Sequence, residues 1–496
     1  MAAPDIQHAI PANYNWDPAA IPAASTWIPP RWMTAPNTPP KTPKHTNVNG
    51  LGEPWDPIRP SFHGVDLTKA DPLLKVPNVE IRSGSDDTVV AFVDVNILDS
   101  TGAAPYQGDV LVKGKRIVSV GSKLTPETLQ GALVVNGRGR TLMSGLCDAH
   151  AHTTWINSPT LDDITAMPIE EHTILSARSA RQFLDGGYTM CVGAAAAKPR
   201  MDLVIRNAIQ AGDIPGPRYL ANGQEMAPSS GALCEGITSY VETPEDITNV
   251  INTFADTGID CIKLSMSGDE ILEDLRAEVT TFSDELVAAG VEAAHARGIR
   301  VCSHARSDKA IRQCIQYGVD ILYHGSFISD ESMDALEAQK DRIFVAPTLN
   351  ILYSSLLAAE KSQFRFTTSA VPKYRRELDI CIAASKEMKR RGIKVLPGGD
   401  YGFAWTPHGS YQDLELFVNL LGYTPMEAIL SATALGGELM LHPHELGKVQ
   451  PGYYADLLLV DGNPLEDISV LTPTNGKLDV IMIVGGHFTA CMARQY

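Results

Sequence analysis

"CDAHAH", residues 147–152, follows an apolar run and carries two histidines one residue apart. On a β-strand, residues two apart point to the same face, so His150 and His152 would share one face with Asp148. Neutral imidazole is the commonest nitrogen ligand of zinc-like ions, and two imidazoles on one face are typical of a metal site. The alternative is a pair of hydrogen-bonded histidines at a strand end. Whether the rest of the chain supplies further metal ligands decides between a metal site and a hydrogen-bonded pair.

The composition of the chain excludes several classes of protein. With 496 residues it is too long for one small core, and 44% hydrophobic and 20% charged residues are usual for a globular protein. A formal net charge of −17 argues against nucleic acid or an anionic membrane as a partner. No apolar run reaches the roughly 20 residues of a membrane span, and the N-terminus lacks the pattern of a secretory signal. The eight cysteines form no CxxC pair, which predicts reduced thiols in a cytoplasmic protein.

Residues 1–80 differ in composition from the rest of the chain. They hold 15 of the 33 prolines and four of the six tryptophans, Trp16, Trp27, Trp32 and Trp55. Proline at this density blocks regular helix and central strand, and a disordered tail is one interpretation. Because disordered segments are usually poor in aromatic residues, we favour an extended N-terminal arm that its tryptophans fix to a surface.

Two β-rich stretches lie towards the ends of the chain. Residues 81–142 contain "TVVAFVDVNILD" and "GDVLVKGKRIVSVG", and residues 441–496 contain "ADLLLVDGNP" and "DVIMIVGGHF". Short strands separated by turns are typical of a β-sandwich or a similar antiparallel unit. We therefore predict a single β-sandwich domain built from both chain ends.

The middle of the chain, residues 143–440, alternates apolar strands with helical stretches. Eight stretches have the composition of strands: "GLCDAHAH", "GYTMCVGAA", "PRYLANG", "CIKLSM", "IRVCSHA", "VDILYHG", "FVAPTLN" and "KVLPGGD". The runs between most of them are amphipathic; in "SDELVAAGVEAAHARG", Ser283 is the expected N-cap and Gly298 lies just past the end. Eight strand–helix units predict an α/β fold, a (β/α)8 TIM barrel, with its functional groups at the C-terminal strand ends.

Polar residues stand at the predicted ends of five of these strands. They are His150 and His152 on the first, Lys263 on the fourth, His304 on the fifth, His324 on the sixth and Asp400 on the eighth. Each has an ordinary explanation alone, as an edge lysine, a histidine satisfied by backbone, or a capping aspartate. Their joint place at one mouth of a barrel predicts a metal centre. The lysine is unusual because its neighbours are apolar, and lysine is almost never fully buried unpaired.

Taken together, these stretches resemble the metal-dependent amidohydrolase superfamily. The similarity is greatest to the subgroup of imidazolonepropionase-like hydrolases, Xaa-Pro and Xaa-Arg dipeptidases and ochratoxin-hydrolysing amidases. The resemblance runs from about residue 86 to the C-terminus, so residues 1–80 fall outside it. The stretches that carry it include "SGLCDAHAHTT", "CIKLSMSG", "GVDILYHGSFI", "PGGDYGFAWTPHGSYQDLELF" and "LGKVQPGYYADLLLVDGNPLEDI".

The resemblance implies two divalent metal ions, with zinc as the expected metal. His150 and His152 would bind the more buried ion, and His304 and His324 the second. Lys263 would be carbamylated, with its carbamate oxygens bridging the ions. A carbamate suits this position because a protonated amine cannot act as a ligand, whereas the carbamate is an anionic oxygen donor.

The resemblance also implies the reaction. Asp400 would bind the buried ion and serve as general base for a metal-bound hydroxide that cleaves an amide-type C–N bond. The expected substrate is an N-acyl amino acid, a dipeptide or an aryl amide. One alternative is a deaminase of the same superfamily, although deaminases usually lack the carbamylated lysine. A catalytically inactive relative is another, although such proteins have typically lost ligands that are all present here.

Five residues near the predicted mouth are candidates for contacting the substrate. Trp155, Tyr401 and Trp405 would offer aromatic walls, with loop packing as the alternative. Arg306 would pair with a substrate carboxylate or form a salt bridge. His408 is the candidate for contacting the substrate or a developing oxyanion, and is a second catalytic candidate, with loop packing again as the alternative. The stretches "MCVGAAAA", "APSSGALCEG" and "ARSD" depart from the family pattern, so no relative's substrate carries over.

The expected partners are a small-molecule amide substrate and further copies of this chain. Barrels of this family commonly associate, so we predict a homo-oligomer with the N-terminal arm at its interface. Neither nucleic acid nor a membrane is an expected partner, because the chain is strongly acidic.

Overall fold

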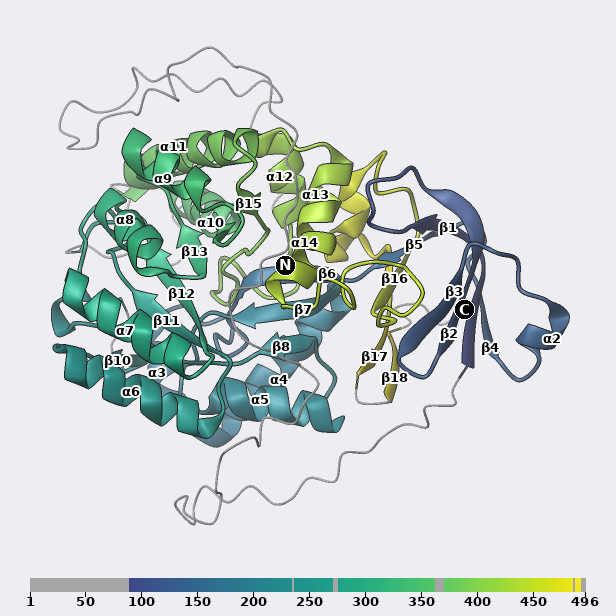
Figure 1. Cartoon of the computed structure of the whole chain (residues 1–496), viewed down its shortest axis with the longest axis horizontal. Coiled ribbons are helices and arrows are strands. Elements are labelled where there is room, and N and C mark those ends of the chain that lie inside the picture. The colour runs from purple at the N-terminus through teal and green to yellow at the C-terminus, as the bar shows by residue number, and fades with distance from the viewer. Residues whose placement is uncertain (1–88, 234–235, 271–274, 362–369, 485–486, 492–496) are drawn as a thin grey trace.

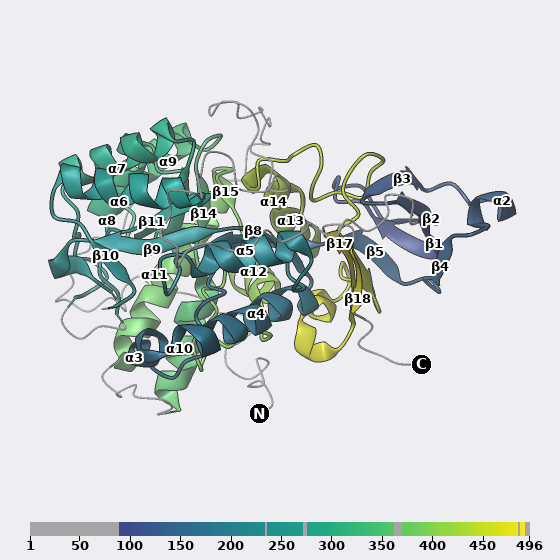
Figure 2. The same ribbon diagram turned by 90° about the horizontal axis from the view of Figure 1, so that it is seen from below.

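The structure is a computed structural model that describes residues 89–233, 236–270, 275–361, 370–484 and 487–491. Figures 1 and 2 both show strands β1–β4 at one end of the molecule and helices α6–α8 at the other. The predicted arm of residues 1–80, with its four tryptophans, lies outside the described residues. Within the described part, no helix is long and apolar enough to cross a lipid bilayer.

Parallel strands from the middle of the chain form the framework of the larger part. One sheet has the order β6-β7-β8 and a second has the order β10-β9-β11-β12-β13-β14-β15, and neighbours run parallel throughout both. The strands are β6 (Leu146–Ala151), β7 (Tyr188–Gly193), β8 (Arg218–Leu220), β9 (Asn222–Ala227), β10 (Thr238–Tyr240), β11 (Cys261–Ser265), β12 (Arg300–Ala305), β13 (Ile321–His324), β14 (Phe344–Ala346) and β15 (Lys394–Val395).

Two backbone features connect these two sheets. The Ala149 N–H donates to the Pro397 carbonyl at 3.0 Å, which joins β6 to the segment after β15. Only Ala221 separates β8 from β9, and the N–H groups of Asp260 and Cys261 both donate to the carbonyl of Ala221. Each of the eight predicted strand stretches contains an observed strand, the third being divided between β8 and β9. Strand β10 was not predicted.

Helices connect these strands and cover them. They are α3 (Leu161–Ala166), α4 (Ile169–Asp185), α5 (Met201–Ala211), α6 (Pro244–Thr257), α7 (Asp284–Ala296), α8 (Asp308–Tyr317), α9 (Asp330–Ala338), α10 (Leu349–Glu360), α11 (Ala370–Arg390), α12 (Asp413–Leu421), α13 (Pro425–Ala432) and α14 (Ala434–Leu439). The predicted N-cap of α7 is confirmed, because Ser283 Oγ accepts from the Leu286 N–H at 3.3 Å. Gly298 follows that helix with a φ of +69°, a conformation in which glycine carries no Cβ penalty.

Strands from both ends of the described chain form one further sheet. Its order is β18-β17-β16-β5-β1-β2-β3, with β4 also on β1. Its strands are β1 (Val89–Leu98), β2 (Tyr106–Lys113), β3 (Arg116–Val120), β4 (Leu133–Asn136), β5 (Thr141–Ser144), β16 (Leu457–Val460), β17 (Leu478–Val484) and β18 (His487–Cys491); the short helix α2 (Pro126–Leu129) precedes β4. One contact between the two ends is the antiparallel pairing of β5 with β16.

The antiparallel unit expected here also contains parallel pairs, and both of them involve β1. This strand lies parallel to β4 along residues 90–93 and parallel to β5 along residues 96–98. A register shift against β2 falls between Phe92 and Val95, and Asp94 there has a φ of +55°. The irregularity bends the strand, so that each half meets a different neighbour.

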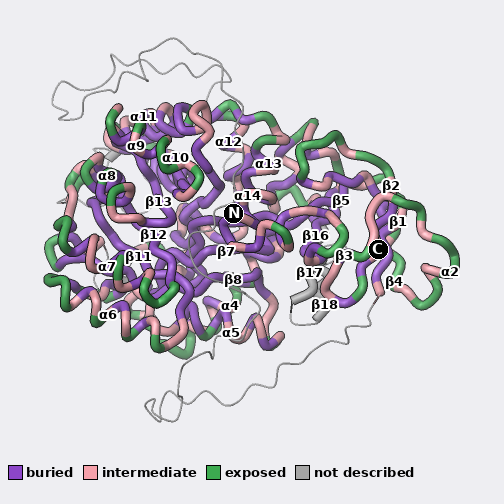
Figure 3. Tube along the Cα trace, viewed as in Figure 1, coloured by how far each residue is buried: buried purple, intermediate pink, exposed green. Residues whose placement is uncertain are grey.

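The strands of the middle are buried on both faces. Every residue of β6, β11 and β12 is buried, and Figure 3 shows exposed segments mainly on the outer helices and loops. Alternate residues of one strand pack into different clusters: Ile262 packs against the helices, whereas Cys261 packs with Cys302 between the strands. Because side chains alternate along a strand, Lys263 and His304 lie on the same face as Cys261 and Cys302, two residues further towards the strand ends.

Candidate active site

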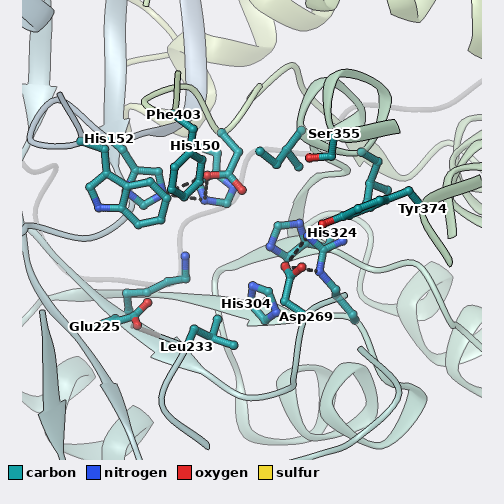
Figure 4. Close-up of a pocket in the computed structure, with 16 residues that line it drawn as sticks. His150, His152, Glu225, Leu233, Asp269, His304, His324, Ser355, Tyr374 and Phe403 are labelled. Atoms are coloured by element: carbon teal, nitrogen blue, oxygen red, sulfur yellow. Dashed lines mark hydrogen bonds and ion pairs between the residues drawn. The ribbon is translucent and has the colours of Figure 1, made fainter. Parts of the chain in front are cut away.

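A cavity opens at the C-terminal ends of the parallel strands (Figure 4). The empty space within it, counted together with the open solvent at its mouth, is about 640 Å³. The residues that line it come from strand ends, from the loops after them and from α10 and α11. They are His150, His152, Trp155, Glu225, Leu233, Lys263, Asp269, His304, Arg306, His324, Ile351, Leu352, Ser355, Tyr374, Asp400 and Phe403.

Three potential metal ligands converge on one side of this cavity. The Nε2 atoms of His150 and His152 lie 3.1 Å apart, and Asp400 Oδ1 lies 3.6 Å from the first and 3.2 Å from the second. All three residues are buried, and the described residues offer Asp400 Oδ1 no aligned hydrogen-bond donor. Each of the three residues offers one ligand atom to the same small space, so the group could hold a metal ion.

The backbone around Asp400 explains how a strand end reaches the two histidines. Asp400 has a φ of +57°, and it follows two glycines. A Cβ on Gly398 would lie 2.9 Å from both the backbone nitrogen and the Cβ of His150. Glycine is therefore required at residue 398 for β6 and the segment after β15 to approach so closely.

Lys263, His304 and His324 lie next to this group. The ring centroids of His304 and His324 are 4.3 Å apart, and those of His150 and His324 are 5.4 Å apart. The Lys263 Nζ lies 4.7 Å from the ring centroid of Tyr323, on the strand that ends at His324. The six predicted metal ligands therefore come together at one cavity.

Hydrogen bonds fix the orientation of the imidazoles. His304 Nε2 lies 3.0 Å from the Gly268 carbonyl, and His324 Nδ1 bonds to the Thr348 hydroxyl. His152 Nδ1 lies 3.3 Å from the Ala195 carbonyl. The second nitrogen of each ring then remains for a ligand, and His324 Nε2 is buried without a hydrogen-bond partner among the described residues.

The protonation states of these groups suit metal binding. Burial lowers the pKa of His150, His152 and His324, and it lowers the pKa of His304 to about 3. These rings are neutral near pH 7. Burial alone would raise the pKa of Asp400, but the adjacent histidines outweigh it and hold the pKa below its usual range. Neutral imidazole and ionised carboxylate are the forms that bind metal.

Two of the predicted substrate contacts line the cavity. The Trp155 ring stacks on His152, with centroids 3.6 Å apart and an interplanar angle of 15°. The Arg306 guanidinium is held by Asp269 at 2.8 Å and by Glu377 at 2.6 Å. For Arg306 the structure thus shows the salt bridge, the second of the two predicted interpretations.

The structure does not bring Tyr401, Trp405 or His408 to the wall of the cavity. The Tyr401 hydroxyl donates to Asp413 at 2.7 Å, and Trp405 Nε1 donates to Ser355 at 3.1 Å. His408 Nε2 lies 2.8 Å from the Trp155 carbonyl. These bonds join the segment after β15 to α12, to α10 and to the loop after β6, and the substrate contacts expected of the three residues stay predictions.

Sequence reasoning missed several residues of the cavity wall. Glu225 lies on β9 and pairs in register with Lys263 of β11, so a correct assignment of β9 would have placed both on one face. Asp269 follows β11 in a loop, and its pairing with Arg306 has no sequence signal. Ser355 and Tyr374 come from α10 and α11, whose angle to the strands no local pattern determines.

The family comparison agrees with this geometry. The Amidohydrolase family matches residues 141–486, and the chain belongs to this family. It is therefore a hydrolase that acts on C–N bonds. The predicted resemblance to the superfamily and its subgroup is confirmed.

Three relatives illustrate the similarity. Ochratoxinase from Aspergillus niger is 26% identical over 422 residues, which cover 79% of this chain and 85% of that protein. Imidazolonepropionase from Cutibacterium acnes is 31% identical over 179 residues, 35% of this chain and 37% of that protein. The crystal structure of a prolidase complexed with N-methylphosphonate-L-proline has a TM-score of 0.72 and 24% identity over 82% of this chain and 100% of that chain, which shows a shared fold.

Proposed function

We propose that this chain is a binuclear metal-dependent hydrolase that cleaves amide-type C–N bonds. The observation that carries the proposal is the cavity in which His150, His152 and Asp400 face the pair His304 and His324. The relatives support amide cleavage, because ochratoxinase and prolidase are both among them.

We also propose that the two parallel sheets close into one (β/α)8 barrel. The hydrogen bond from Ala149 to Pro397 and the short step between β8 and β9 support closure at both junctions. A closed barrel places all five ligand-bearing strand ends at one mouth. Along the sequence, the barrel stands between residues 81–142 and residues 441–496. We propose that these two β-rich parts form one domain.

The residues present fit two divalent cations, for which zinc is our proposal. His150, His152 and Asp400 would hold one, and His304 and His324 the other. Lys263, carbamylated, would bridge them. Divalent ions held here supply Lewis acidity, which polarises an amide carbonyl and makes water a better nucleophile near neutral pH.

The side chains of the chain itself would perform the remaining steps. Asp400 Oδ1, ionised at neutral pH, would accept a proton from the attacking water and deliver it to the leaving nitrogen. Trp155 and Phe403, with ring centroids 4.9 Å apart, would shield the reacting bond from bulk water and position an apolar substituent.

Metal analysis and product analysis of the purified protein test this function. We expect about two divalent ions per chain and the release of a carboxylic acid and an amine from N-acyl amino acids, dipeptides or aryl amides. Release of ammonia from a heterocyclic substrate, with the acyl compounds untouched, would instead support the deaminase alternative. Protein that binds no metal and turns over neither class would be the inactive relative.

A further inference from the structure

The charge of the cavity wall away from the proposed metal ligands is negative. Arg306 is the basic group there, and its side chain is only 1% exposed. Its Nε and one terminal nitrogen bond to Asp269 Oδ2 at 3.0 and 2.8 Å, and the other terminal nitrogen donates to Glu377 at 2.6 Å. One cation thus faces two carboxylates. Burial raises the pKa of Glu377 to about 7, and even with Glu377 protonated the trio has no positive charge left over.

Glu225 adds a second acidic group to the wall. It is 3% exposed, and its two carboxylate oxygens accept from the hydroxyls of Thr238 at 3.1 Å and Ser265 at 2.9 Å. In the described part of the chain no basic side chain forms an ion pair with it within 4.0 Å. Figure 4 shows Glu225 and Asp269 on the side of the cavity opposite Phe403 and Ser355.

The remaining wall is apolar or aromatic. Leu233, Ile351, Leu352 and Phe403 contribute hydrocarbon surface, and Trp155 contributes an indole face. A substrate group entering the cavity meets Phe403 on one side, and on the other it meets Glu225 and Asp269 with Leu233 beside them (Figure 4). Away from the proposed metal centre, which includes Lys263, the described residues of this wall offer no basic group other than Arg306 to compensate an incoming anion.

We propose that this cavity selects amides that carry no carboxylate next to the scissile bond, and so takes neutral or cationic amides such as aryl and arylalkyl amides. This inference rests on the proposed amide hydrolysis and narrows it from the wider class that includes dipeptides and N-acyl amino acids. A carboxylate would have to displace Asp269 from Arg306, or remain buried beside Asp269 and Glu225. Either outcome costs more than binding the same molecule without its charge.

A matched pair of substrates tests the selectivity of the zinc-loaded, full-length protein. N-benzoylphenethylamine and N-benzoylphenylalanine differ by one carboxylate beside the scissile bond. We expect kcat/KM for the first to exceed that for the second by at least about tenfold, the effect of one unfavourable charge contact of about 1.4 kcal/mol. A smaller ratio, or the reverse preference, overturns the inference.

Substitutions at the two acidic residues locate the cause. Asp269→Asn and Glu225→Gln keep the size of each side chain and remove one negative charge. Each should raise the relative kcat/KM for the carboxylate substrate about tenfold. Asp256→Asn is the matched control. Asp256 lies on α6 and forms an exposed ion pair with Arg297, so this substitution should leave the ratio of the two kcat/KM values unchanged. An unchanged ratio in both cavity variants, with melting temperatures like the parent's, would also overturn the inference.

Binding of analogues that cannot be hydrolysed separates this inference from the proposed function. The corresponding benzenesulfonamides of phenethylamine and phenylalanine keep the same charge difference, and calorimetry on the metal-loaded protein gives their Kd values. Absence of turnover with a tenfold preference for the neutral sulfonamide would contradict amide hydrolysis and support the selectivity. Turnover of the amides without a preference for the neutral compound in kcat/KM or Kd would support amide hydrolysis and contradict the selectivity.

Discussion

Lys263 is the residue whose chemical state distinguishes the proposed binuclear centre from a single-metal site. We expect Lys263→Ala to lose at least one metal equivalent and nearly all hydrolysis, because the bridging anion is removed. Short-chain carboxylates such as acetate or propionate should restore part of the metal content and part of the hydrolysis, since they supply oxygen atoms in place of the carbamate. Elemental analysis and an amide hydrolysis assay measure the two effects.

The control for this prediction is Lys263→Arg. The guanidinium is permanently charged and cannot form a carbamate, so this variant should be no better than alanine despite its similar length. Full activity in either variant would leave the binuclear proposal without its bridge.

Asp400 allows metal binding and proton transfer to be separated. Asp400→Asn keeps one oxygen ligand but cannot accept a proton, so it should retain much of its metal and lose at least about a hundredfold in kcat. Metal content and kcat measured on the same preparation make the comparison. A loss below tenfold would assign the base to another residue.

The sequence predicted the gathering of the candidate ligands better than the rest of the cavity wall, and the reason lies in the geometry of strands. A strand end has a defined place in a parallel sheet, so spacing alone brought His150, Lys263 and His304 to one mouth. Loop residues have no such reference. Tyr401 and His408 come after β15, yet Tyr401 bonds to Asp413 at the start of α12 and His408 to the backbone of Trp155.

At the scale of single elements, the start of α6 offers a test of local stability. Thr243 Oγ1 accepts from the Asp246 N–H at 3.1 Å, and Asp246 accepts in return from the Thr243 N–H at 2.9 Å, which completes a capping box. Thr243→Ala should lower the free energy of unfolding by about 1 kcal/mol. Urea denaturation measures this loss.

Thr243→Ser is the matched control, because serine keeps the hydroxyl that accepts the bond. It should unfold within a few tenths of a kcal/mol of the parent, and both variants should retain kcat because α6 contributes no residue to the cavity. Equal destabilisation by alanine and serine would mean that the methyl group, not the cap, stabilises this helix end.

Elements with a strong local signal were predicted, and those decided by distant contacts were not. The apolar runs gave strands, and a serine before a periodic run gave the start of α7. Strand β10 is only three residues long, and its pairing with β9 depends on tertiary contact. The parallel pairing of β1 with β4 and β5 was missed because local alternation does not reveal the direction of a neighbour.

At the scale of the whole molecule, a buried ion pair joins the two β-rich ends to the larger part. Arg218 at the start of β8 donates to both oxygens of Asp456 at 2.6 and 3.0 Å, and both side chains are buried. Asp456→Ala would remove the carboxylate that faces the buried Arg218 guanidinium. We expect a loss of about 3–5 kcal/mol in unfolding free energy, measured by guanidinium denaturation.

Asp461→Ala is the control for that measurement. Asp461 pairs with Lys477 at 3.1 Å on the surface, where an ion pair contributes about 1 kcal/mol or less. A similar loss of unfolding free energy in both variants would show that the buried ion pair at the junction stabilises the protein no more than the surface pair does.

The N-terminal arm of residues 1–80 remains a prediction from composition, as does the homo-oligomer that we propose it holds together. Deleting residues 1–60 should shift the protein to a smaller species in analytical ultracentrifugation, while metal content stays that of the full chain. An unchanged mass and melting temperature would make the segment a passive tail.

The pairing of β5 with β16 has a consequence for how the protein is made. Thr141 lies opposite Val460, so one edge of β5 lacks its partner until residues 457–460 have left the ribosome. Until then the nascent chain presents an open strand edge that other chains can pair with. A chain that terminates before β16 cannot cover this edge of β5. We therefore expect products of such premature termination to be targets for chaperones and proteases.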